Sequence, residues 1–124
     1  MSLLLDTHTV LWWLAQMRLT DDVREEINDP GSSVFVSAAT VWEVAIKVNL
    51  GKLETPESLV VAATEEGFQP LPISMEHAER AGSLPLHHKD PFDRLLIAQA
   101  QLDGLTIVTR DRAFDAYEVP VRRC

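Results

Sequence analysis

Four acidic side chains, Asp6, Glu43, Asp93 and Asp111, lie where predicted strands and helices begin or end, and three of them interrupt apolar segments. Burying a charge without a partner is costly, so acids at such positions suggest a shared purpose. Carboxylate oxygens are the ligands that Mg²⁺ and Mn²⁺ prefer, and these ions keep bound waters. Such an ion polarises a phosphodiester and lowers the pKa of the attacking water. The four acids therefore predict a divalent metal site that acts on a phosphate.

Asp6 and Asp111 each follow a predicted strand, formed by residues 3–5 and 105–109. In open parallel sheets, ligands bind beyond the carboxyl ends of strands, where the strand order reverses. Each acid also has a purely structural alternative. Asp6 is a favoured helix N-cap, and an aspartate after a strand is common in turns. Position alone leaves both alternatives open.

Glu43 belongs to a predicted helix, residues 38–50, in which Thr40, Glu43 and Lys47 form one polar stripe. One interpretation is a solvent face on which Glu43 and Lys47 pair, contributing about 0.2–0.5 kcal/mol. The other is that the stripe lines a cleft. The rest of the helix is apolar around most of its circumference, so we expect it to be largely buried, which favours the cleft.

Asp93 stands near the start of a helix that Asp90 caps and Pro91 opens, in a pattern resembling a capping box. Capping explains an acid near a helix start but not the face that it occupies. The later positions on the face of Asp93 are all apolar: Leu96, Ile97 and Ala100. We therefore expect Asp93 on the core-facing side and Arg94 on the outward side. A carboxylate so placed needs a partner or a metal ion.

Other catalytic sites fit the sequence less well. A haloacid dehalogenase-type phosphatase would carry an aspartate at position 8, which is His8, and a receiver domain would carry an acceptor aspartate where Gln69 stands. The chain has no glycine-rich phosphate loop, and its histidines lack a zinc-like spacing with cysteine. We expect His87 and His88 in a solvated loop.

Strands and helices alternate along the chain. The expected strands are 3–5, 34–36, 105–109, a poor edge strand at 68–73 and a weak last one at 119–121; the expected helices are 10–15, 20–28, 38–50, one starting at Thr55-Pro56-Glu57, 75–84 and 90–104. This order predicts an α/β fold with a mostly parallel sheet of four to five strands and helices on both faces.

Composition fits one compact domain, residues 1–124, because 124 residues at 46% hydrophobic content supply a single core. A membrane span, a secretory signal and an internal disulfide are not expected, and the lone Cys124 suits an intracellular, cytoplasmic protein. The net charge of −8 argues against nucleic acid. Basic residues near the four acids soften that argument, as a basic rim or as ordinary surface charge: Lys47, Lys52, Lys89, Arg94, Arg110 and Arg112.

Four segments in order resemble a PIN domain of the VapC type, the toxin of a bacterial or archaeal toxin–antitoxin pair: LDTH at 5–8, SAATVWE at 37–43, DPFDRLLIA at 90–98 and VTRD at 108–111. The resemblance spans nearly the whole chain. It implies a three-layer α/β/α fold and endoribonuclease activity that depends on Mg²⁺ or Mn²⁺.

The resemblance also implies residue roles. Asp6, Glu43, Asp93 and Asp111 would form the acidic cluster, with Asp6 and Asp93 binding metal most directly. Ser37 and Thr109 would support the site through their hydroxyls, and Asp115 would be an accessory acid. We further expect Lys47, Arg94 or Arg110 to contact phosphate.

The expected partners are an RNA substrate, a cognate antitoxin that covers the site, and a second copy of the chain in a homodimer. The apolar segment 10–14 suits a partner contact, although plain core packing explains it as well. The alternative function is a catalytically inactive PIN-like module that binds RNA or a protein. The intact set of acids disfavours that alternative.

Overall fold

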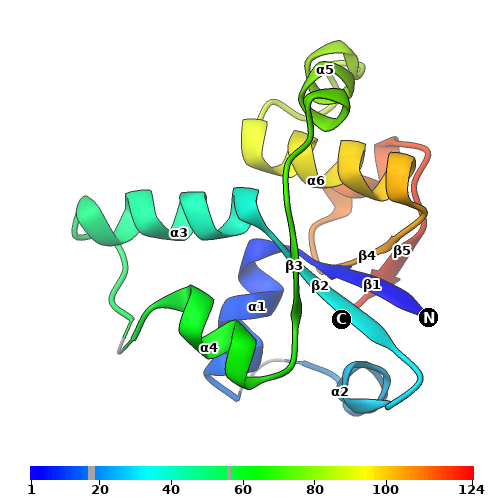
Figure 1. Cartoon of the computed structure of the whole chain (residues 1–124). Coiled ribbons are helices and arrows are strands. Elements are labelled where there is room, and N and C mark those ends of the chain that lie inside the picture. The colour runs from blue at the N-terminus through cyan, green and yellow to red at the C-terminus, as the bar shows by residue number, and fades with distance from the viewer. Residues whose placement is uncertain (17–18, 56) are drawn as a thin grey trace.

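The computed structural model describes residues 1–16, 19–55 and 57–124 (Figure 1). Its strands are β1 (Ser2–Leu5), β2 (Ser33–Ser37), β3 (Gln69–Leu71), β4 (Thr106–Thr109) and β5 (Val121–Arg123). Its helices are α1 (Thr7–Leu14), α2 (Asp21–Asn28), α3 (Ala38–Asn49), α4 (Leu59–Glu65), α5 (Met75–Ser83), α6 (Pro91–Asp103) and the 3-10 helix η1 (Arg112–Ala116).

The five strands form one sheet in the order β3-β2-β1-β4-β5, and every neighbouring pair is parallel. From β1, the chain adds β2 and β3 on one side and β4 and β5 on the other. The strand order therefore reverses between β1 and β4, where Leu5 pairs with Val108. In open α/β sheets this is the point at which ligands bind, beyond the carboxyl ends of the strands.

Two apolar cores lie on opposite faces of the sheet. Successive side chains of a strand point to opposite faces, so Leu3 and Leu5 join one core with α1, α2 and α4, whereas Leu4 joins the other with α6 and η1. Figure 1 shows α5 and α6 on one side of the sheet and α1, α2 and α4 on the other. The three-layer α/β/α arrangement and the parallel sheet predicted from the sequence are confirmed.

The three helices that carry or border the candidate acids, α1, α3 and α6, each begin with a polar N-cap residue. Asp6 follows β1 and caps α1, Ser37 is the last residue of β2 and caps α3, and Asp90 caps α6 with Pro91 at its first position. These side-chain oxygens accept hydrogen bonds from the backbone N–H groups that a helix leaves unpaired at its start. Gly104 ends α6 with a φ of 68°, a left-handed conformation that glycine adopts without steric cost.

Some sequence predictions are wrong in detail. The helix expected from Thr55 begins at Leu59, because Ser58 supplies the cap; the part of that prediction resting on Pro56 falls outside the described residues. The last strand is Val121–Arg123 rather than 119–121. No helix in the described part of the chain is long and apolar enough to cross a membrane.

The expectation of a largely buried α3 is also wrong in part. Trp42 is 58% exposed and Val48 is 41% exposed. In Figure 1, α3 runs outward beyond the edge of the sheet, so the sheet covers only part of its apolar surface. These exposed positions leave an apolar surface on α3.

Candidate metal centre

Asp6 lies at the end of β1, 4% exposed, with both carboxylate oxygens engaged. Its Oδ1 accepts the N–H of Thr9 at 2.9 Å, which is the helix cap, and its Oδ2 accepts the hydroxyl of Thr109 at 2.6 Å. The two alternatives left open for Asp6 are therefore compatible, because one oxygen caps α1 while the other turns toward the end of β4.

Asp111 lies just beyond β4 and is exposed. Its carboxylate accepts the N–H of Ala113 at 2.9 Å and begins η1, so the predicted turn chemistry is present. Its own N–H donates to the Thr109 hydroxyl at 3.0 Å. Thr109 is fully buried and thereby connects the segments that carry Asp6 and Asp111.

Glu43 is 7% exposed and points inward from α3. Its Oε1 accepts the Thr7 hydroxyl at 2.6 Å, and its Oε2 lies 2.9 Å from the ammonium of Lys47. Thr40, in the same stripe, is fully buried. The solvent-face interpretation of this stripe is therefore wrong, and the Glu43–Lys47 pair exists at the inner edge of the helix instead. Because Thr7 follows Asp6 directly, Glu43 borders the same end of the sheet.

Asp93 lies on the buried side of α6, as its spacing predicted, and its side chain is 17% exposed. Its Oδ2 is 2.7 Å from Nε2 of His88. Burial raises the pKa of Asp93 to about 6, with smaller contributions from the charges of Asp90 and Asp6, while the hydrogen bond to His88 acts in the opposite direction. Asp90 alone supplies the helix cap. The partner of the Asp93 carboxylate is therefore the imidazole of His88.

Among the described residues, one group of metal-ligating side chains lies close together: His88, Asp93 and Asp111, whose ligand atoms are all within 4.8 Å of one another. Asp6 and Glu43 are outside this group, although the charge of Asp6 acts on Asp93. Two carboxylates and one imidazole form a donor set that suits a divalent ion. The residues present therefore fit the metal that the sequence implied.

Arg94 faces inward, so its predicted outward orientation is wrong, and it is only 8% exposed. The guanidinium donates hydrogen bonds of 2.8–3.2 Å to four backbone carbonyls, those of Ala81, Leu84, Pro85 and His88. The loop after α5 covers this side of α6, which sequence spacing could not reveal. These bonds leave Arg94 poorly placed to contact phosphate.

His88 is the functional candidate that sequence reasoning missed, since it was expected in a solvated loop. Tyr117 fixes the same loop: its hydroxyl accepts the His88 N–H at 2.8 Å and donates to the Pro85 carbonyl at 2.7 Å. The only signal in the sequence was the position of His88 five residues before Asp93, which alone is weak. The contact of His88 with Asp93 depends on the clamp, the set of hydrogen bonds by which Arg94 and Tyr117 hold the loop backbone.

The remaining predicted residues have structural contacts near the site. Ser37 is fully buried, caps α3 and donates to Gln99 at 2.7 Å. Arg110 donates to the Cys124 carbonyl at 2.8 Å and stacks 4.4 Å from the Trp12 ring centroid. Asp115 pairs with Arg123 at 2.6 Å on the surface. None of the three belongs to the group of ligand atoms around Asp93.

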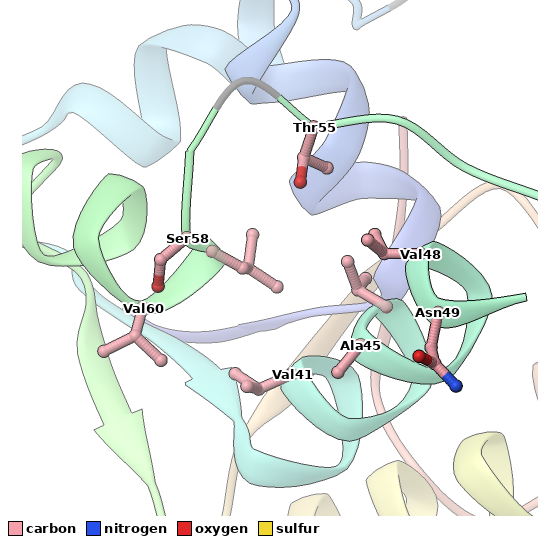
Figure 2. A pocket seen from close by; sticks show the side chains of 9 residues that line it. Val41, Ala45, Val48, Asn49, Thr55, Ser58 and Val60 are labelled. Atoms are coloured by element: carbon pink, nitrogen blue, oxygen red, sulfur yellow. The ribbon is translucent and has the colours of Figure 1, made fainter. Parts of the chain in front are cut away.

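The surface has two apolar depressions, one between α3 and α4 and one along α1. The first, with a volume of about 390 Å³, lies between α3 and the start of α4, where Val41, Ala45, Val48 and Val60 line it (Figure 2). No titratable side chain is among its described lining residues, so it offers contact surface rather than chemistry. The second, about 620 Å³, runs beside α1 and has four glutamates along it: Glu54, Glu57, Glu65 and Glu66.

Residues 3–120 match the family model described as "PIN domain". The chain belongs to the PIN domain family. Among curated proteins, this PIN domain is 25% identical to ribonuclease VapC22 of Mycobacterium tuberculosis over 122 residues, covering 96% of the chain and 94% of that protein. It is 35% identical to ribonuclease VapC16 of the same organism over 63 residues, which cover 49% of the chain and 45% of that protein.

Solved structures share the fold. The crystal structure of VapBC2 from Rickettsia felis, bound to a promoter DNA fragment, matches with a TM-score of 0.76 and 13% identity, covering 100% of this chain and 99% of that chain. DNA-bound VapBC from Salmonella typhimurium matches with a TM-score of 0.73 and 17% identity, covering 99% and 98%. The PIN domain fold and the VapC-type resemblance predicted from the sequence are confirmed.

Proposed function

We propose that this PIN domain is a metal-dependent endoribonuclease and the toxin of a toxin–antitoxin pair. The observation that carries the proposal is the convergence of His88, Asp93 and Asp111 beside Asp6, at the point where the strand order reverses. Similarity to a protein named ribonuclease VapC22 over 96% of the chain supports the activity. We further propose that residues 1–124 form a single PIN domain.

The site residues divide by position. Asp93 and Asp111 are proposed to hold Mg²⁺ or Mn²⁺, and Asp6 to bind it directly or to orient its waters from the end of β1. A divalent ion held by these residues would polarise the phosphodiester and lower the pKa of the attacking water. Glu43 adds negative charge from α3 and is oriented by Thr7 and Lys47. Ser37 caps α3 and bonds Gln99 of α6, and Thr109 connects the ends of β4 and β1 through its bond to Asp6.

Phosphate contacts are proposed for Lys47 and Arg110. The Lys47 side chain is 40% exposed beside Glu43, so its ammonium can reach a phosphate from the rim of the site. Arg110 adjoins Asp111 and packs on Trp12, which presents its charge on the same edge of the sheet. Two local cations of this kind, together with the metal, compensate for the net charge of −8 when an RNA backbone approaches.

The proposed antitoxin contact uses the groove beside α1. Val10 is fully buried in the core, whereas Leu11, Trp12 and Leu14 are half-buried and line the groove. Val10 therefore shows the core packing expected of segment 10–14, and the groove residues are available for the proposed contact. The glutamates along the groove favour basic side chains on the antitoxin. For the homodimer, we propose the exposed apolar side of α3, and for location the cytoplasm, where an RNA substrate is available.

The decisive experiment is RNA cleavage by the purified protein with Mg²⁺ or Mn²⁺, compared with EDTA, with Asp93→Asn and with Asp21→Asn. Asp21 is an exposed acid of α2 and is the matched control. We expect cleavage by the wild type and by Asp21→Asn, and none with EDTA or with Asp93→Asn. Equal cleavage by Asp93→Asn would contradict the proposal. RNA binding that persists in EDTA without any cleavage would instead favour the inactive binding module.

A further inference from the structure

The backbone of the loop between α5 and α6 is fixed by hydrogen bonds from the side chains of Arg94 and Tyr117. Arg94 donates to three carbonyl groups of the loop, those of Leu84, Pro85 and His88, and to one in the last turn of α5. Tyr117 bonds both the N–H of His88 and the carbonyl of Pro85. Burying a guanidinium costs free energy unless its hydrogen bonds are made, and here they are made to the loop backbone. The clamp fixes the position of one side chain in particular, His88.

The clamp directs Nε2 of His88 at the acids rather than at solvent. That nitrogen lies 2.7 Å from Asp93 Oδ2 and belongs to the group of ligand atoms within 4.8 Å of one another. Ligands of one octahedral ion with bonds of about 2.1 Å lie about 3.0 Å apart when adjacent. The 2.7 Å separation of the two atoms is therefore close to that expected of two adjacent ligands of one ion.

The neighbouring histidine provides an internal contrast. His87 is exposed, and its ring packs edge-on against Tyr117 with the centroids 5.3 Å apart. It is not among the side chains grouped around Asp93. Of this adjacent pair, only His88 is oriented toward the carboxylates.

We propose that His88 Nε2 is a direct ligand of the metal, so that the centre is a mixed nitrogen–oxygen site that prefers a transition ion such as Mn²⁺ to Mg²⁺. The inference rests on the proposed function and adds a ligand to its metal site. Mg²⁺ is bound almost entirely by oxygen and gives up its waters reluctantly. Imidazole nitrogen is the softer donor and favours first-row transition ions. A site of carboxylates alone would not discriminate in this way.

The test is electron paramagnetic resonance of Mn²⁺ bound to the full chain, with detection of ¹⁴N coupling, in the wild type, His88→Gln and His87→Gln. Glutamine can still donate a hydrogen bond to Asp93 but has no imidazole nitrogen, so it separates metal ligation from positioning. We expect ¹⁴N coupling in the wild type and in His87→Gln, and its loss in His88→Gln. Titration calorimetry should show Mn²⁺ affinity falling about tenfold or more in His88→Gln, with little change for Mg²⁺.

Each outcome decides the matter. Bound Mn²⁺ without ¹⁴N coupling in the wild type overturns the inference; if such a protein still cleaves RNA, the proposed nuclease function stands. Equal losses of Mn²⁺ and Mg²⁺ affinity in His88→Gln would likewise show that His88 only positions Asp93. Absence of Mn²⁺ binding by the wild type would overturn both proposals. Thermal unfolding of the three proteins in EDTA checks that a lost signal does not reflect a lost fold.

Discussion

The Thr109 hydroxyl donates a hydrogen bond of 2.6 Å to Oδ2 of Asp6. Thr109 ends β4 and Asp6 directly follows β1, and these neighbouring parallel strands meet where the strand order of the sheet reverses. The same hydroxyl accepts the N–H of Asp111, so one buried oxygen orients the segments that carry two of the four acids. The relative positions of Asp6 and Asp111 therefore depend on the neutral side chain of Thr109 as well as on the carboxylates themselves.

Replacing Thr109 with valine keeps the shape of the side chain and removes both bonds. Since a hydrogen bond to a charged group contributes about 1.5–3 kcal/mol, we expect a similar loss in the free energy of unfolding and weaker Mn²⁺ binding. Urea denaturation and titration calorimetry measure the two effects. Thr106→Val, at the partly buried start of β4, is the matched control. Unchanged Mn²⁺ affinity in Thr109→Val would show that Asp6 does not serve the metal.

Asp93 should lower the stability of the metal-free protein at neutral pH. Its pKa is about 6 in the folded chain against 3.8 for an ordinary aspartate, so folding binds a proton between these values. The stability associated with that proton is present at low pH and is lost as pH rises through about 6, by up to about 3 kcal/mol. Asp93→Asn should therefore be more stable than the wild type at pH 8 in EDTA, by about 1–3 kcal/mol, and less so near pH 4.

Denaturation curves at the two pH values measure this difference, with Asp21→Asn as the control that should stay within about 0.5 kcal/mol. Added Mn²⁺ should stabilise the wild type at pH 8 and leave Asp93→Asn unchanged, because a ligand stabilises only the state that binds it. A destabilised Asp93→Asn at pH 8 would mean that its carboxylate is needed for folding rather than for the metal.

Arg94 should matter for the metal without touching it. Arg94→Met leaves four backbone carbonyls without their donor, and we expect a loss of about 2–4 kcal/mol in the free energy of unfolding. Arg94→Lys, with fewer and differently directed donors, should lose less stability but still loosen the loop that carries His88. Mn²⁺ affinity should therefore fall in Arg94→Lys at a temperature where the protein is folded. Arg80→Lys, on the exposed side of α5, is the control.

The sequence predicted the parts of this site that local rules govern. Asp6 and Asp111 follow short apolar runs that predict strands, and Asp93 lies on the apolar face of its helix, which the 3.6-residue periodicity makes visible in the chain. It could not predict where His88 and Arg94 point, because a loop that packs across a helix is positioned by contacts distant in sequence. Tyr117, which fixes that loop, is 29 residues from His88.

Glu43 illustrates the same limit and yields a further prediction. Its stripe on α3 was visible in the sequence, but an inward stripe and a solvent face have the same spacing, and only burial to 7% exposure separates them. If the inward carboxylate serves the metal, Glu43→Gln should reduce Mn²⁺ affinity by about 10–100-fold, the usual effect of removing a carboxylate that orients a metal site. Thr7 can still donate to the glutamine oxygen, so stability should change little.

Lys47→Gln separates this role from the ion pair. The pair is partly exposed and contributes at most about 1 kcal/mol, so its loss should leave the free energy of unfolding nearly unchanged. Removing the cation should leave Mn²⁺ affinity equal or slightly higher, because an anionic site then faces less positive charge. If Glu43 existed mainly to hold Lys47, the two variants would instead weaken Mn²⁺ binding equally. Opposite effects on Mn²⁺ affinity, measured by calorimetry under one set of conditions, would place Glu43 with the acids of the metal centre.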